Sequence, residues 1–485
     1  MTQPTLPRRA LLAAGSLATL GAFMPRREAA ARSPSEAPAA LRFPAGFRWG
    51  TATSSYQVEG AVNEDGRGPS IWDSFVRQPG RIADGSTGDV AADHYHRYKE
   101  DIALMKAMGA QTYRFSIAWP RLFPDGRGLN EKGIAFYDKL VDGLLEAGIE
   151  PFPTLYHWDL PQVLQDKGGW QARDTALALG DYAAEVARRL SDRVGHFFTL
   201  NEMSTFVELG YREGIFAPGL ELDAAALNQV RHHAVLAHGL AVQAVRANAK
   251  PGTKVGPAEN IATALPAVET TENIRAAELA TRELNAPYLT VMLEGRYTDA
   301  YLAASGASAP TFTARDLEII ASPVDFVGLN VYTPSQYVVA SEAKPGWSVL
   351  PFQPSHPHMA SDWLRMGPES LYWAPRHAAK LWGNRDIYIT ENGTSAADRS
   401  GPDGAIYDMD RVMYLRSYLT QLQRATAEGV PVRGYFLWSL LDNFEWADGY
   451  SKRFGVVHVD FATQKRTPKL SASFYREVIA RNATA

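Results

Sequence analysis

The sequence predicts a single α/β domain folded as a (β/α)8 (TIM) barrel, with its site at the C-terminal ends of the strands. Eight short apolar runs, rich in β-branched and aromatic residues, alternate with segments of helical spacing. No Pro- or Gly-rich linker interrupts this alternation, and right-handed crossovers of this number close into a barrel. An open doubly wound sheet is the alternative. It would carry a Gly-rich phosphate turn after its first strand, and Gly66-Arg67-Gly68 lies outside a strand-to-helix turn.

The strand predictions rest on composition and on the residues that stop each run. Pro120 stops the second run, and the turn signal Asn392-Gly393 stops the seventh. Pro151 and Pro153 weaken the third run, because proline donates no ladder hydrogen bond. In chain order, the expected strands are 47–54, 112–119, 150–158, 196–202, 254–259, 324–330, 386–391 and 433–440.

The helix predictions rest on spacing and on glycines that suit a C-cap, namely Gly109, Gly148 and Gly429. The expected helices are 92–108, 134–147, 175–190, 224–248, 272–284, 371–382, 409–429 and 474–481. Residues 333–362 are rich in Pro and Ser and lack periodicity, which predicts a long loop over the site.

The N-terminus has the pattern of a targeting segment. Arg8-Arg9 precede an apolar run at 10–23, and Ala29-Ala30-Ala31 offers small residues for cleavage. The run is too short to predict a membrane span. We expect residues 1–32 to be a bacterial export signal of the twin-arginine type, which implies a periplasmic or secreted protein. Residues 33–42 have the composition of a linker, and the folded domain is expected at 43–485.

Composition excludes several classes of function. The 485 residues include no cysteine, which excludes disulfides, thiolate catalysis and cysteine-based zinc sites. A net charge of −4 gives no indication of the basic surface that nucleic-acid binding needs. His94 and His96 are two residues apart and His232 and His233 are adjacent, so neither pair has the helical spacing of a metal site. No metal or cofactor is expected, and the sequence makes no prediction of the oligomeric state.

Two strands end in a carboxylate. The run at 387–390 leads to Glu391, and the run at 196–201 leads to Glu202. In a barrel both lie at the same mouth, and two carboxyl groups there are the minimal equipment for cleaving a glycosidic bond. Other strand ends are also polar or aromatic, where a barrel built for stability alone needs none. These residues are Gln57, Arg114, His157, Asn201, Asn330, Tyr332, Trp438, Glu445 and Trp446.

The chemistry needs two unequal carboxyls, one protonated and one ionised. Glu202 has only an Asn beside it among apolar residues, which favours its neutral form. Glu391 is expected to be held ionised by Arg114 and by a hydrogen bond from Tyr332.

Several motifs in order resemble glycoside hydrolase family 1, the β-glucosidase family of retaining enzymes, over roughly residues 43–480. The motifs lie at 47–60 (FRWGTATSSYQVEG), 113–121 (YRFSIAWPR), 157–161 (HWDLP), 199–202 (TLNE), 389–393 (ITENG) and 438–446 (WSLLDNFEW).

The resemblance implies that Glu202 is the acid/base and Glu391 the nucleophile, with carboxyl groups about 5–5.5 Å apart. It implies that the hydroxyls of the first sugar bind to Gln57, His157, Asn201, Glu445 and Trp446. Trp438 would form the stacking floor beneath that sugar. Arg114, Asn330 and Tyr332 would support the nucleophile.

The chain departs from the family pattern at three places. Met203 stands where the family usually has Pro, which questions the shape of the leaving-group side. Glu259 adds a carboxylate near the mouth, and a cap of the next helix is favoured over a leaving-group contact. Val331 stands where the family often has an aromatic residue.

Glu445 indicates an unphosphorylated substrate, because a carboxylate accepts sugar hydroxyls but repels a phosphate. The expected function is a retaining β-glycosidase, most simply a β-glucosidase, that acts on a small-molecule β-glycoside or oligosaccharide. The alternatives are a transglycosidase with the same first step and a sugar-binding barrel without catalysis.

Overall fold

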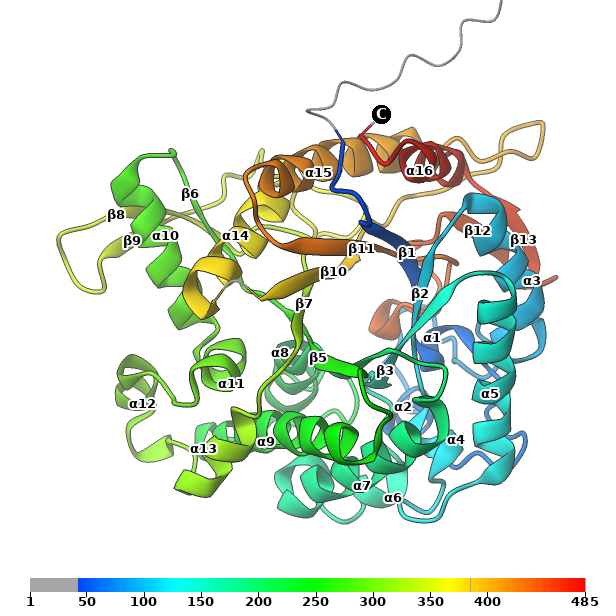
Figure 1. Ribbon diagram of the computed structural model, residues 1–485, viewed down its shortest axis with the longest axis horizontal. Coiled ribbons are helices and arrows are strands. Elements are labelled where there is room, and N and C mark those ends of the chain that lie inside the picture. Colours follow the sequence, from blue (N-terminus) through cyan, green and yellow to red (C-terminus); the bar gives the residue numbers. More distant parts are fainter. Residues whose placement is uncertain (1–41, 384, 485) are drawn as a thin grey trace, which may run out of the picture. The chain divides into compact units, whose positions relative to one another are not determined.

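The structure is a computed structural model that describes residues 42–383 and 385–484, and its centre is a closed barrel of parallel strands (Figure 1). Around the barrel the strands follow the order β1-β11-β10-β7-β5-β4-β3-β2. Their bounds are β1 Arg48–Ala52, β2 Thr112–Ser116, β3 Glu150–Tyr156, β4 His196–Asn201, β5 Lys254–Asn260, β7 Phe326–Asn330, β10 Asp386–Asn392 and β11 Val432–Trp438. All eight predicted strands are therefore present, and the predicted barrel is confirmed.

Helices surround the barrel (Figure 1). The longer ones are α3 His94–Met108, α5 Glu131–Glu146, α7 Arg173–Leu190, α9 Ala224–Asn248, α10 Thr271–Leu284, α14 Ser370–Trp382, α15 Met409–Ala427 and α16 Leu470–Arg481. The shorter ones are α1 Ser55–Val58, α2 Ile71–Phe75, α4 Trp119–Leu122, α6 Gln162–Gln165, α8 Met203–Val207, α11 Val291–Glu294, α12 Asp299–Ser305 and α13 Ala314–Ile320. Each predicted helix corresponds to one of the longer helices.

Aromatic rings fill the barrel interior toward the N-terminal ends of the strands. Phe152 of β3 lies 5.1 Å from Phe436 of β11 and 5.7 Å from Tyr388 of β10, measured between ring centroids. Phe198 of β4 lies 5.2 Å from Phe326 of β7. This packed interior closes one end of the barrel and leaves the C-terminal ends of the strands to form a site.

The long loop predicted at 333–362 is wrong in part. The segment contains β8 Gln336–Ala340 and β9 Trp347–Leu350, which form a three-stranded sheet with β6 Ala264–Pro266 outside the barrel. Val338 is fully buried in this sheet. The Pro and Ser residues of the segment obscured short strands whose partner β6 lies about 70 residues earlier in the chain. The sequence analysis also missed the hairpin of β12 Val457–Asp460 and β13 Lys465–Pro468.

The first and last described residues of the domain lie side by side. The backbone N–H of Phe43 donates to the carbonyl of Asn482 at 2.8 Å, and Arg42 bridges to Ala483. The export signal predicted at 1–32 and residues 33–41 of the predicted linker lie outside the described residues. Within the described ranges, no helix is both long and apolar enough to cross a membrane.

Candidate active site

The ends of the strands bring the predicted site residues into one hydrogen-bond network at the barrel mouth. Arg114 of β2 donates to Glu391 of β10 at 2.6 Å and to the side-chain oxygen of Asn201 of β4 at 2.6 Å. Asn330 of β7 donates to Asn201 at 3.0 Å and to Glu202 at 2.7 Å. Residues from four strands are thereby fixed relative to one another.

Glu391 has charge-stabilising partners on both carboxylate oxygens. Arg114 contacts Oε1, and the hydroxyl of Tyr332 donates to Oε2 at 2.7 Å. Burial raises the pKa of Glu391, while Arg114 and the hydrogen bond from Tyr332 act to lower it. The two expected contacts are present, but they only counteract the burial and do not bring the pKa below its usual value.

Glu202 is held without a cation. It follows β4 in a left-handed conformation with φ of 45°, and its Oε1 accepts from Asn330. Burial, followed by the charge of Glu391, raises the pKa of Glu202 to about 8. Arg114 contacts Glu391, whereas Glu202 is contacted by neutral groups, the amide of Asn330 and the hydroxyl of Thr205. A proton shared by the pair therefore resides on Glu202. This agrees with the expected neutral form.

His157 presents a free hydrogen-bond donor. The oxygen of the Asn201 side chain accepts from Arg114 and Asn330, so its nitrogen must be the atom that meets His157 Nε2 at 3.1 Å. Burial lowers the pKa of His157 well below its usual value, so the ring is neutral and carries its proton on Nδ1. That Nδ1 is buried without a partner among the described residues, which suits a ligand hydroxyl.

Gln57 links the first strand end to the last. Its side-chain nitrogen donates to Asn443 Oδ1 and to the carbonyl of Phe444, both at 3.0 Å, and lies 3.4 Å from Glu445 Oε2. Burial and three neighbouring carboxylates, Asp448, Glu391 and Glu202, raise the pKa of Glu445 well above its usual value. Glu445 is partly exposed, and its protonated carboxyl can both donate and accept hydrogen bonds at the mouth of the barrel.

Aromatic rings form one wall of the site. Trp438, at the end of β11, stacks on His157 with centroids 5.8 Å apart. Trp446 stacks on Tyr56 at 6.2 Å and packs against Trp158 at 4.5 Å. Rings in these positions present flat apolar faces of the kind that sugar rings cover.

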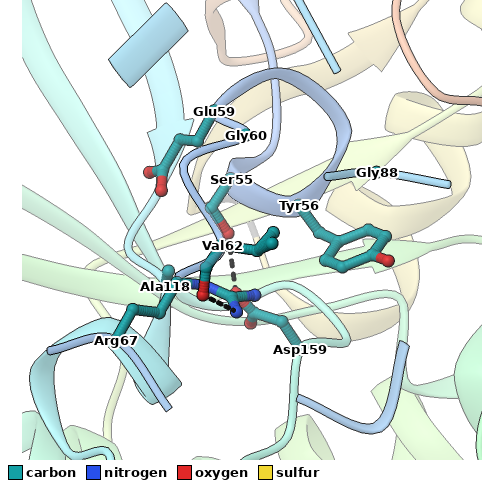
Figure 2. Close-up of a pocket in the computed structure, with 9 residues that line it drawn as sticks. All are labelled: Ser55, Tyr56, Glu59, Gly60, Val62, Arg67, Gly88, Ala118 and Asp159. Carbon is teal, nitrogen blue, oxygen red and sulfur yellow. Dashed lines mark hydrogen bonds between the residues drawn. The ribbon is translucent and has the colours of Figure 1, made fainter. Parts of the chain in front are cut away.

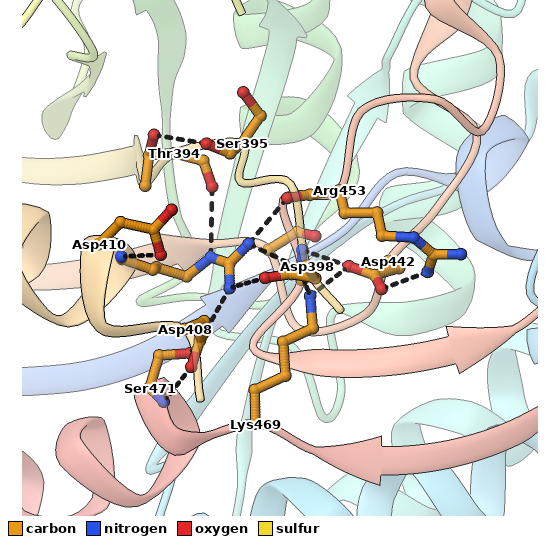
Figure 3. Close-up of polar contacts among 12 residues, drawn as sticks. Thr394, Ser395, Asp398, Asp408, Asp410, Asp442, Arg453, Lys469 and Ser471 are labelled. Carbon is orange, nitrogen blue, oxygen red and sulfur yellow. Dashed lines mark hydrogen bonds and ion pairs between the residues drawn. The ribbon is translucent and has the colours of Figure 1, made fainter. Parts of the chain in front are cut away.

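A buried ionic cluster supports the loop that carries Glu445 and Trp446. Lys469 donates to both Asp398 and Asp442, and Asp442 also pairs with Arg453 (Figure 3). The side chains of Lys469 and Asp442 are fully buried. The cluster also contains Arg411, Asp408, Thr394 and Ser471. It ties residues 439–455 to α15, to the start of α16 and to the segment after β10.

A small polar cavity lies beside the aromatic wall, at Tyr56, and it is too small for a sugar. It measures about 10 Å³, room for about one water molecule. Its lining includes Tyr56, Arg67 and Asp159, and Ser55 donates to Asp159 at 2.8 Å (Figure 2). Burial raises the pKa of Asp159 to about 7.

Several residues of the network were missed by the sequence analysis. Thr390 donates to Asn330 at 2.6 Å, and the ring nitrogen of Trp158 donates to the carbonyl of Asn201 at 2.9 Å. Trp363 is 46% exposed and packs edge-on against Tyr332. Thr390 and Trp158 lie within the sequence motifs, next to residues predicted for the site, and this position was the sequence feature that could have identified them. No sequence pattern indicated Trp363.

No cluster of three or more His, Asp or Glu side chains in the described part of the chain could hold a metal ion.

Fold and site together define a (β/α)8 barrel with two buried carboxyls at its mouth. The model of glycosyl hydrolase family 1 matches residues 39–484. Beta-glucosidase A of Acetivibrio thermocellus is 46% identical over 450 residues, which span 91% of this chain and 99% of that protein. The 1,4-beta-D-glucan glucohydrolase of Thermotoga neapolitana is 43% identical over 443 residues, 91% of this chain and 99% of that protein.

Among solved structures, the β-glucosidase from Thermotoga maritima in complex with deoxynojirimycin matches with a TM-score of 0.83 and 40% identity. The match covers 92% of this chain and 100% of that chain. The chain belongs to glycosyl hydrolase family 1.

Proposed function

We propose that Glu391 is the nucleophile and Glu202 the acid/base of a retaining β-glucosidase, which removes terminal unphosphorylated β-D-glucosyl residues. The observation that carries this assignment is the unequal environment of the two carboxyls. Glu391 bonds to a guanidinium and a phenol, whereas Glu202 bonds to neutral groups only, the amide of Asn330 and the hydroxyl of Thr205. The former environment favours an anion, and the latter favours a neutral acid.

The reaction has two displacements. In the first, Glu391 attacks the anomeric carbon while Glu202 gives its proton to the departing glycosidic oxygen, which forms a glycosyl ester on Glu391. In the second, Glu202 takes a proton from water as the water attacks the same carbon. The ester bond breaks, Glu391 leaves as a carboxylate, and Glu202 is protonated again. Two inversions retain the β configuration.

The groups around the carboxyls suit the first sugar. The free Nδ1–H of His157 can donate to a hydroxyl. The carboxyl of Glu445 can bond to hydroxyls and offers no positive charge to a phosphate group. Trp438 offers an apolar face as the floor. The residues that we propose to bind the first sugar also include Gln57, Asn201 and Trp446. The names of the relatives, β-glucosidase and glucan glucohydrolase, support glucose as the sugar, as does the glucose-like inhibitor in the matching structure.

The test is hydrolysis of a panel of nitrophenyl β-glycosides by the wild type, Glu391→Gln and Glu202→Gln, with the product anomer followed by NMR. We expect β product from the wild type and almost none from Glu391→Gln. Glu202→Gln should lose about 10²–10⁴-fold in kcat/KM with a poor leaving group and far less with an activated one. Inverted product would refute the nucleophile. Sugar binding without turnover would indicate a non-catalytic barrel, and transfer products would indicate a transglycosidase.

We propose that the protein is exported to the periplasm or beyond. Support comes from Arg8-Arg9, the apolar run at 10–23 and the small residues at 29–31. The family match begins only at residue 39. Fractionation of bacterial cells that express the full chain should place activity outside the cytoplasm, and Arg8→Lys/Arg9→Lys should retain it inside. Equal distribution of both proteins would contradict export by this route.

A further inference from the structure

The peptide groups that follow Glu202 are bonded to a buried carboxylate of the neighbouring strand. Glu259 of β5 accepts the backbone N–H of Met203 at 2.7 Å through Oε2 and that of Ser204 at 3.0 Å through Oε1. The hydroxyl of Ser204 also donates to Oε1 at 2.6 Å. Glu259 is fully buried. Both of its oxygens are thus occupied by the first turn of α8, the helix that begins directly after Glu202.

These bonds hold the backbone of Glu202 from both sides. Its own N–H donates to the carbonyl of Ala258 at 2.8 Å, so adjacent residues of β5 bind three consecutive peptide N–H groups. Glu202 has a left-handed φ, which residues other than glycine rarely adopt without support. The direction in which its side chain leaves the backbone therefore depends on the contacts made by Glu259.

We propose that Glu259 is a positioning residue for Glu202, acting through the peptide groups of Met203 and Ser204. The inference rests on the proposed function, in which Glu202 is the acid/base. From the sequence, Glu259 was expected to cap the helix after β5. The structure instead shows a cap of α8, which follows β4.

The burial of residue 203 explains why this carboxylate is needed. Met203 is fully buried, and its backbone N–H requires an acceptor that water does not supply. Glu259 supplies that acceptor.

Glu259 also contributes to the electrostatics of the acid/base. Its charge acts with that of Glu391 to raise the pKa of Glu202, and burial raises its own pKa to about 7. The other titratable groups that interact with Glu202 are Glu445 and Tyr332, and Tyr288 interacts with Glu259.

The test compares Glu259→Gln and Glu259→Leu with the wild type on phenyl and 2,4-dinitrophenyl β-glucosides. A misplaced acid should lower kcat/KM for the phenyl glucoside about 10- to 100-fold. The activated glucoside needs little protonation, so its loss should stay below about tenfold. In Glu259→Gln the alkaline limb of the pH profile should move to lower pH, because Glu202 loses an anionic neighbour and ionises more readily. The acid limb, governed by Glu391, should stay in place.

Two further variants separate positioning from a general loss of stability. Glu259→Leu leaves the N–H groups of Met203 and Ser204 without their acceptor. Adding Met203→Pro removes one of these two N–H groups with a residue suited to a first helical turn, and should restore part of the phenyl glucoside rate. Asp316→Asn is the control. Asp316 is a buried carboxylate that accepts the backbone N–H of Thr313 at 3.0 Å in the capping box of α13. The Asp316→Asn substitution should lower the free energy of unfolding and should move neither the acid limb nor the alkaline limb of the pH profile.

Equal losses on both glucosides with an unmoved alkaline limb would overturn the positioning role. So would full activity of Glu259→Leu. A wild type that is inactive on every β-glucoside would instead refute the proposed function, and the positioning role with it.

Discussion

Tyr332 is the residue whose single hydroxyl distinguishes the two carboxyls most directly. It donates to Glu391 Oε2 at 2.7 Å. Tyr332→Phe should raise the pKa of Glu391, because a bond that favours the anion is lost. The acid limb of kcat/KM should therefore move to higher pH. A hydrogen bond to a charged group contributes about 1.5–3 kcal/mol, so kcat/KM should fall about 10- to 100-fold.

The matched control for this prediction is Tyr418→Phe. The hydroxyl of Tyr418 donates to the backbone carbonyl of Tyr332 at 2.9 Å and does not bond to a site carboxylate. Its removal should leave the acid limb in place. A Tyr332→Phe enzyme with an unchanged pH profile would show that Arg114 alone maintains the charge of Glu391.

At the residue scale, the sequence predicted the side chains that stand at strand ends and the contacts of Arg114 and Tyr332 with Glu391. It missed the other contacts that cross between strands. Glu391 and Glu202 could be predicted because an apolar run stops at each of them. Thr390 stands beside Glu391, but this position does not reveal its role, which is a hydrogen bond to Asn330, 60 residues away. The net effect of burial on Glu391 also depends on packing from several strands, which no local pattern reports.

At the scale of elements, Lys469 ties the start of α16 to the loop that carries Glu445 and Trp446 (Figure 3). Lys469→Met would leave Asp398 and Asp442 buried with one cation fewer. Removing one member of a buried ionic cluster costs about 3–5 kcal/mol of unfolding free energy. We expect a loss of that size in urea unfolding, and a raised KM because the loop is less firmly held.

Arg433→Met is the control for that prediction. Arg433 pairs with Asp386 at 2.7 Å, but its side chain is 51% exposed. Exposed pairs contribute about 0–1 kcal/mol, so the control should lose at most about 1 kcal/mol. Equal losses in the two variants would contradict a structural role for the buried cluster.

At the scale of elements, the sequence pattern predicts the strands of the barrel but not those of the outer sheet. Barrel strands are buried on both faces and read as continuous apolar runs, as in 387–390. The outer strands β8 and β9 are short and partly exposed, and their sequence contains the polar and proline-flanked pattern of a loop. Only pairing with β6 makes this segment regular.

At the scale of the whole molecule, two sets of buried groups give the folding stability an unusual dependence on pH. Burial raises the pKa of Glu202 to about 8 and the pKa values of Glu259 and Asp159 to about 7. Burial lowers the pKa values of His238 and His377 to about 3. The pKa of His232 is lowered to about 4.

The two sets act in opposite directions. The carboxyls bind more protons in the folded state above about pH 4, so the stability they provide is lost as the pH rises through 7 to 8. The histidines bind more protons in the unfolded state below about pH 6.5, so their stability is lost as the pH falls toward 3 to 4. Between about pH 4.5 and 6.5, the carboxyls lower the free energy of unfolding as the pH rises and the histidines increase it, so the two effects oppose each other.

We therefore expect the unfolding free energy to be greatest at about pH 4.5–6.5 and to fall on both sides, by on the order of 1 kcal/mol per pH unit for each group. Urea unfolding from pH 4 to 8.5 measures this dependence. Asp159→Asn should flatten the decline above pH 6.5, because asparagine cannot ionise. Glu318→Gln, at a side chain that is 65% exposed, should leave the slope unchanged. A maximum above pH 8 would mean that these carboxyls are ionised in the folded protein, and the acid role of Glu202 would lose its electrostatic basis.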